Sequence, residues 1–120
     1  MVADAWLGLD TDLRRRLRDV LEDPPRPITE AELRRLLEEG QACTRILGAE
    51  LGRLERRLAQ LGSDPDSSLG EIADTFRRVH DFRVHVEELD ELMSALERRA
   101  REVRTERLRA KNSPVSRGAR

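Results

Sequence analysis

The sequence predicts an all-α fold, in which a long antiparallel helical hairpin of the coiled-coil type carries a short N-terminal third helix packed at its open end. Two long stretches carry apolar residues at alternating spacings of three and four, and only a short turn separates them. A shorter amphipathic stretch precedes them and ends at a group of prolines. Because a repeat averaging 3.5 residues keeps one stripe of a helix against its neighbour, these patterns predict paired helices.

The composition is typical of long helices with much exposed surface. Of the 120 residues, 39% are charged and only 2% are aromatic. This mixture disfavours a β-sandwich or a large ligand pocket. A chain of this length holds one domain at most, so we expect a single helical domain over residues 1–110 and a disordered basic tail over residues 111–120.

The first helix is expected over about residues 10–22, where Asp10 or Thr11 can serve as its cap. Trp6 precedes this cap and is expected to fold over the end of the bundle. The prolines at positions 24, 25 and 27 end the helix, because proline has no amide donor and restricts the residue before it. The apolar stripe of this helix consists of Leu13, Leu17, Val20 and Leu21.

A complete start signal opens the second helix, which is expected over about residues 30–61. Thr29 is the expected N-cap, Glu32 completes a capping box three residues later, and Ile28 can pack onto Leu33. Gly62 is the expected C-terminal cap. The apolar seam of this helix consists of Leu33, Leu37, Gly40, Thr44, Leu47, Leu51, Leu54, Leu58 and Leu61.

The third helix is expected over about residues 69–109, opened by a second capping-box pattern at Ser68 and Glu71. Beyond it, the residues from Lys111 onward are polar and contain proline and glycine, which favours disorder. The seam of this helix consists of Ile72, Thr75, Val79, Phe82, Val86, Leu89, Met93, Leu96, Ala100 and Val103.

A turn as short as residues 62–68 makes the two long helices antiparallel neighbours. Pairing Leu61 with Ile72 places small Gly40 opposite large Met93, as a packed seam requires. The first helix can return along the half of the hairpin away from the turn, which leaves the other half as a bare two-helix coiled coil. Because a slender hairpin leaves its seam partly wet, we expect a homodimer with a four-helix core.

Charge is distributed unevenly along the chain. Residues 98–120 carry a balance of +7, so the other residues sum to −8, although the whole chain is −1. Such a basic arm suits phosphate groups or an acidic partner surface, so association with nucleic acid is an alternative function. The arm has no aromatic residue for base stacking. The residues expected to contact a partner or phosphate are Arg98, Arg101, Arg104, Arg107, Arg109 and Lys111.

Two patterns on the third helix could carry chemistry. Asp81, His85 and Glu88 fall at i, i+4 and i+7, so one face presents three possible metal ligands, although a solvated polar face is the simpler interpretation. Arg78 and His85 have an R-x6-H spacing, which resembles the motif of the HEPN-type RNases, small helical dimers in which Arg and His act on the phosphodiester. That family usually has a polar residue where this chain has Val79, so we expect two charged residues beside the seam instead.

Two further features are assigned structural roles. Residues 6–8, Trp-Leu-Gly, form a WxG tripeptide that resembles that of the small helical-hairpin proteins exported by type VII secretion. In that family the tripeptide lies in the turn between the two long helices, whereas here it precedes the first helix, so we do not carry the family's function over. Cys43 stands alone, which excludes an intramolecular disulfide, and we expect a buried structural thiol.

The sequence therefore predicts a non-catalytic helical interaction protein: an adaptor, a scaffold or a small subunit of a protein assembly that self-associates through its hairpin. The expected partners are a second copy of the chain and another protein. No glycine-rich phosphate loop, Ser-His-Asp set or paired cysteine motif occurs, so no catalytic, cofactor or metal site is expected. A small RNase or metal-site enzyme built around Arg78 and His85 is the less favoured alternative.

The sequence also predicts the cellular location of the protein and the type of genome that encodes it. No apolar run approaches the length of a membrane span, and the N-terminus lacks a signal-peptide pattern. We therefore expect a cytoplasmic protein. Lys111 is the only lysine beside many arginines, which is typical of a GC-rich bacterial genome.

Overall fold

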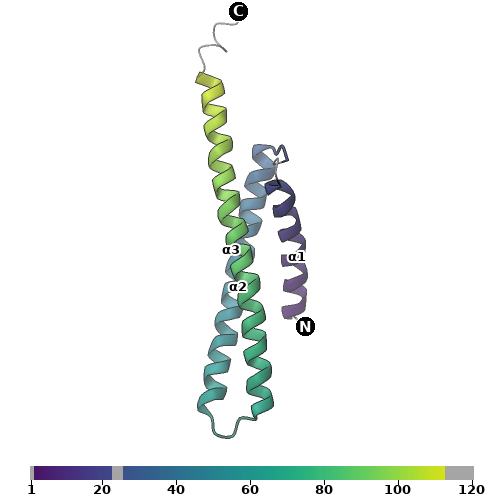
Figure 1. Ribbon diagram of the computed structural model, residues 1–120, viewed down its shortest axis with the longest axis vertical. Helices are drawn as coiled ribbons and strands as arrows, with labels where there is room; N and C mark the ends of the chain where they lie inside the picture. Colours follow the sequence, from purple (N-terminus) through teal and green to yellow (C-terminus); the bar gives the residue numbers. More distant parts are fainter. Residues whose placement is uncertain (1, 23–25, 113–120) are drawn as a thin grey trace, which may run out of the picture.

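The computed structural model describes residues 2–22 and 26–112, with the backbone alone for residues 2–10. This part of the chain forms three helices and no strand: α1 (Val2–Leu21), α2 (Glu30–Ser63) and α3 (Leu69–Asn112). As Figure 1 shows, α2 and α3 run antiparallel as a hairpin, and α1 lies along the open half of the hairpin, away from the turn. The fold predicted from the sequence is therefore confirmed. None of the helices in the described ranges has the length and apolar character that crossing a membrane demands.

Both expected capping interactions of the long helices are present. At the start of α2, the amide of Glu32 donates to Thr29 Oγ1 at 3.1 Å. At the start of α3, the amide of Glu71 donates to Ser68 Oγ, also at 3.1 Å. Each hydroxyl thereby satisfies one of the amides that a helix N-terminus leaves without a partner.

The ends of the long helices differ slightly from the prediction. α2 continues through Gly62 to Ser63, and the amide of Asp64 closes it by donating to the carbonyl oxygen of Leu61. Asp64 has a φ of -99°, so the helix ends without the left-handed glycine cap that was expected. α3 runs to Asn112, which places the first two residues of the expected tail in the helix; residues 113–120 lie outside the described ranges.

The start of α1 corrects the prediction more substantially. The helix begins at Val2 and not near residue 10, so Asp10 and Thr11 lie inside it and do not cap it. Residues 2–9 contain no proline, and half of them are Ala or Leu, so the backbone can remain helical through them. Thr11 is exposed, and an exposed threonine inside a helix costs only about 0.7 kcal/mol relative to alanine. The side chain of Trp6 lies outside the described residues.

The seam joins α2 and α3 in the predicted register. A Cβ atom added at Gly40 would lie 2.7 Å from Met93 Cε and closer still to its Sδ. Met93 therefore occupies the space that the glycine leaves free. Equal steps along the two antiparallel helices then bring Leu47 level with Val86.

Ion pairs between the two helices follow the same register. They cross the seam near the turn, at mid-length and at the open end, and their order along α2 is the reverse of their order along α3. Exposed pairs of this kind stabilise a fold by only about 0–1 kcal/mol each. They are therefore evidence for the register of the two helices and contribute little to its stability. They are Arg57–Glu71, Glu55–Arg83 and Glu30–Arg107.

The two rows of seam residues on α2 are buried to different extents. The row that includes Leu47 and Leu54 is buried along the hairpin. The alternate row is only half-buried over the same length, and it consists of Leu37, Thr44, Leu51 and Leu58. The core thus lies toward one side of the hairpin, where the buried residues Leu17 and Val20 of α1 join it.

We expect Gly48→Ala to stabilise the protein and Gly40→Ala to destabilise it. No other side chain lies within 4 Å of a Cβ at position 48, so alanine there adds about 0.5–1 kcal/mol through its higher helix propensity. The same gain at position 40 is outweighed by displacement of Met93, which costs about 1–3 kcal/mol in a packed core. Urea unfolding followed by circular dichroism measures both changes. Equal stability of the two variants would contradict the close contact at Gly40.

Candidate interaction surfaces

A buried arginine and apolar contacts hold α1 against the hairpin. Leu17 and Val20 are fully buried in the shared core. Arg14 is only 8% exposed, and its Nη1 lies 2.6 Å from Glu88 Oε2 on α3. Arg18 forms an ion pair with the same carboxylate. Glu88 thus binds two cations of α1, one of them buried, and is a central polar contact of this docking.

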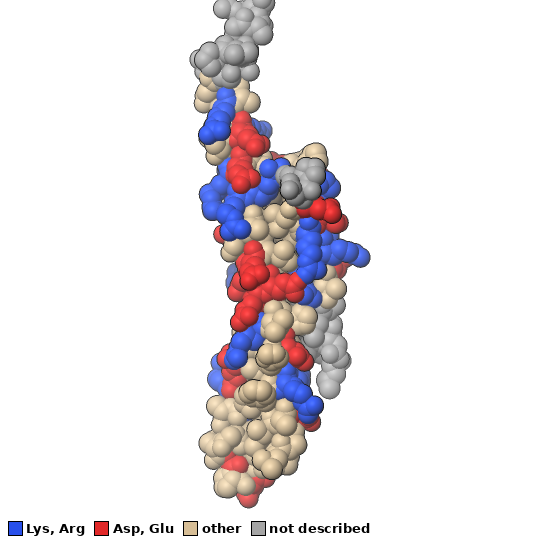
Figure 2. Space-filling view, viewed as in Figure 1, with Lys and Arg blue, Asp and Glu red and all other residues tan. Residues whose placement is uncertain are grey.

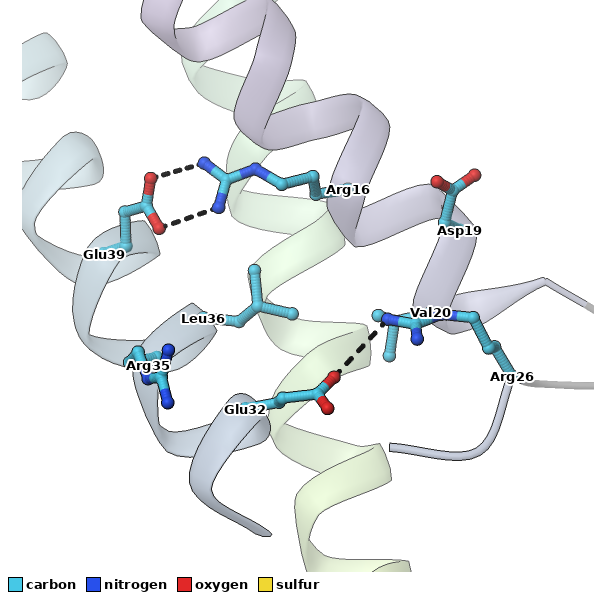
Figure 3. Close-up of a pocket in the computed structure, with 8 residues that line it drawn as sticks. All are labelled: Arg16, Asp19, Val20, Arg26, Glu32, Arg35, Leu36 and Glu39. Carbon is cyan, nitrogen blue, oxygen red and sulfur yellow. Dashed lines mark hydrogen bonds and ion pairs between the residues drawn. The ribbon is translucent and has the colours of Figure 1, made fainter. Parts of the chain in front are cut away.

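Another arginine of α1, Arg16, reaches α2 (Figure 3). Both of its terminal nitrogens donate to the carboxylate of Glu39, and this hydrogen bonding raises the pKa of the guanidinium further above its ordinary value. The pair lies beside Val20 and Leu36 in a shallow groove of about 250 Å³. Typical ligand pockets enclose about 300–1,000 Å³ and are mainly apolar. This groove is therefore best described as the contact between two helices.

The residues that could have served chemistry have separate roles in the structure. Arg78 and Asp81 are exposed, and His85 is half-buried, whereas the carboxylate of Glu88 is bound by two arginines of α1. Among the described side chains, those of residues 11–22 and 26–112, no group of three or more His, Cys, Asp or Glu residues is arranged to hold a metal ion. Cys43 is half-buried and packs against the core. Of the three possible metal ligands, Glu88 therefore has a structural role, because it forms ion pairs with Arg14 and Arg18.

Residues 98–112 of the basic arm form the last turns of α3, and the end of this helix extends past the start of α2 (Figure 1). Arg107 forms an ion pair with Glu30 of α2, and Glu102 and Glu106 share a shallow groove with three arginines of the arm. The cations therefore surround the helix and do not form one continuous face. The other residues predicted to contact a partner or phosphate are all exposed, namely Arg98, Arg101, Arg104, Arg109 and Lys111.

The side of the hairpin opposite α1 is uncovered. At 3.6 residues per turn, Glu39 lies about 160° around α2 from Glu55, and Glu88 lies about 140° around α3 from Arg83. Glu39 and Glu88 bind α1, whereas Glu55 and Arg83 bind each other, with 3.1 Å between Glu55 Oε2 and Arg83 Nη2. The Glu55–Arg83 pair therefore marks the free side.

This free side is apolar near the turn. Leu69 is 85% exposed and Phe76 is 61% exposed, and both lie on the stripe of α3 that contains Arg83, at steps of seven residues. On the face that Figure 2 shows, the turn end of the molecule is mostly uncharged, in contrast to its middle and its open end. We call this surface the hairpin face; it consists of Leu51, Gly52, Leu58, Ala59 and Gly62 of α2 and Leu69, Ile72 and Phe76 of α3.

Reasoning from the sequence did not identify this face. The signal that could have found it is the spacing of the small residues Gly48, Gly52, Ala59 and Gly62, which follow the same seven-residue frame as the seam. Small residues in that frame show where another helix can approach closely. These small residues can be interpreted as a contact surface only when the uncovered side of the hairpin is known. The position of α1 determines which side that is.

We expect Glu88→Gln to destabilise the protein by about 1–3 kcal/mol, because the buried guanidinium of Arg14 loses its compensating charge. The amides of α1 should then exchange with solvent faster than those of α2. Glu91→Gln is the matched control, since Glu91 is exposed and forms no ion pair among the described residues. Urea unfolding and hydrogen exchange measure the two effects. If both variants behave like the parent, Glu88 does not hold α1.

Similarity to other proteins gives no guide to these surfaces. No protein-family model matches the chain, and neither a curated protein sequence nor a solved structure matches it. A function therefore has to be inferred from the fold and the surfaces of the chain itself.

Proposed function

We propose that the protein is a non-catalytic helical interaction protein, an adaptor, scaffold or small assembly subunit, that self-associates through its hairpin. The hairpin face is the observation that carries the proposal. It sets large exposed apolar side chains, Leu69 and Phe76, beside small residues on the side that α1 leaves uncovered. Contiguous exposed apolar surface of this kind is typical of protein–protein contact sites.

The exposed area supports self-association. The chain has 8647 Å² of accessible surface, whereas a compact monomer of 13.8 kDa exposes about 6,600 Å². The radius of gyration is 20.7 Å, compared with about 13.6 Å for a compact domain of this length. The excess area, about 2,000 Å², is as large as the surface of about 1,200–2,000 Å² that a stable protein–protein interface buries.

We expect the full chain to form a dimer at micromolar concentration, because association removes the half-buried row of the seam from water. Sedimentation equilibrium measures the mass without reference to shape, which matters for so elongated a chain. The weight-average mass should rise from one chain to two with increasing concentration. A mass of one chain throughout, up to about 100 times that concentration, would contradict self-association.

The basic arm supports a second candidate function, the binding of phosphate groups on nucleic acid. The specific observation is that the last turns of α3 project past the other helices with their cations exposed. Two glutamates interrupt the positive charge, which suits attraction to a phosphate backbone better than reading of a base sequence.

If the arm binds nucleic acid, affinity for a fluorescein-labelled DNA duplex should fall with salt, with a slope of about −4 to −5 in log–log form for five phosphate contacts. Removing residues 108–120 deletes Arg109, Lys111, Arg117 and Arg120 and leaves Arg98, Arg101 and Arg104 of the five expected contacts, so the slope should shrink to about −3. Arg77→Glu, on the opposite half of the hairpin, is the control and should leave the slope unchanged. Fluorescence anisotropy measures the binding, and equal affinity of the shortened chain would end this candidate.

A further inference from the structure

We propose that the hairpin face binds the same face of a second copy of this chain, about a twofold axis parallel to the long axis of the hairpin, with both turns at the same end. The inference rests on the proposed self-association and names the residues and the geometry that carry it. Rotation about such an axis keeps every residue at its own height along the hairpin. It therefore lays α3 of each copy on α2 of the other.

The seam fixes which residues meet. Gly40 lies opposite Met93, and equal steps along two antiparallel helices keep later pairs level. In the twofold copy, Leu69 then comes within two residues of the level of Gly62 of the other chain, and Phe76 within two residues of the level of Ala59. Large exposed side chains of one copy thus stand over small residues of the other, as close helix packing requires.

Space is present where the large side chains would enter. No other side chain lies within 4 Å of a Cβ at Gly62, and at Gly52 only Arg56 Nη1 approaches, at 3.4 Å. His80, which is exposed, comes level with Gly52 of the other copy. Each copy therefore offers both the projecting residues and the hollows that receive them, which is the condition for an isologous interface.

Charge beyond the apolar part is complementary in the same arrangement. Arg45 continues the Gly52 stripe of α2, while Glu87 and Asp90 continue the matching stripes of α3, and all three are exposed. None of the three forms an ion pair within the described residues. Arg45 of one copy comes level with the span between Glu87 and Asp90 of the other, so each chain contributes one cation and two anions to two identical contacts.

The alternative twofold arrangement lacks this fit. With the turns at opposite ends, α2 would lie on its own copy and α3 on its own copy. The small residues of α2 would then face α2 of the other copy and Phe76 would face α3, and Arg45 would lose its acidic partners, which lie on α3. The placement of α1 permits both arrangements, because α1 lies on the far side of the hairpin and leaves the full length of the face free.

Charge reversal in separate chains tests the geometry. Arg45→Asp sets like charges against Glu87 and Asp90, and Glu87→Arg with Asp90→Arg sets like charges against Arg45. We expect each variant alone to dimerise at least tenfold more weakly than the parent. An equimolar mixture of the two should regain the affinity of the parent as a heterodimer, because both contacts are then between opposite charges. If the substitutions weakened the dimer only by disturbing the fold of their own chain, mixing the two variants would not restore the affinity.

Truncation of the large side chains tests the apolar part. Leu69→Ser with Phe76→Ser should weaken the dimer at least a hundredfold while circular dichroism shows unchanged helix content, because both side chains are exposed in the single chain. Leu108→Ser is the matched control: Leu108 is 60% exposed and lies in the last turns of α3, at the end of the hairpin away from the hairpin face. The control should dimerise like the parent.

The measurements separate the face from self-association in general. Sedimentation equilibrium of the full chains gives the dimer affinity of each variant and of the mixture. A dimer that tolerates the Leu69 and Phe76 changes, or a mixture that gains no affinity over its components, overturns the proposed face while self-association stands. A parent chain that remains monomeric overturns both.

Discussion

The close packing of α2 against α3 is the constraint on which the rest of the structure depends. A glycine opposite a methionine lets the two helices approach, and their contact fixes the alignment of every later pair along the hairpin. The three interhelical ion pairs follow that alignment and contribute little energy of their own. Displacing one helix by a few residues would separate these pairs and set large side chains against each other. The seam thus determines both the core and the arrangement of the surface residues.

α1 divides the hairpin into two regions of different character. It adds Leu17, Val20 and the buried guanidinium of Arg14 to one side of the open half. The other side of the seam, and the whole of the half near the turn, keeps the geometry of a two-helix coiled coil. Along the open half, a single short helix therefore helps to bury one row of seam residues and leaves the alternate row half-exposed.

Much of this fold could be predicted from the sequence because its signals are local or periodic. The caps at Thr29 and Ser68 depend on residues three positions apart, and the register follows from large and small residues in two seven-residue frames. The start of α1 could not be predicted, since Asp10 and Thr11 are suited to a cap and are also tolerated inside a helix. The partners of Glu88 and the hairpin face depend on which side α1 covers, and that choice arises from packing between distant segments.

The length of α3 has a consequence for the state of its own final turns. Past the start of α2 these residues have almost no tertiary packing, and they are rich in cations spaced one turn apart. Like charges at that spacing disfavour the helix by about 0.2–0.5 kcal/mol per pair, and short unsupported helical segments are marginally stable in water. The end of α3 is therefore the part of this helix that the rest of the fold supports least. Any polyanion that neutralises these cations would shift the helix–coil equilibrium toward helix and so couple its own binding to the ordering of the chain.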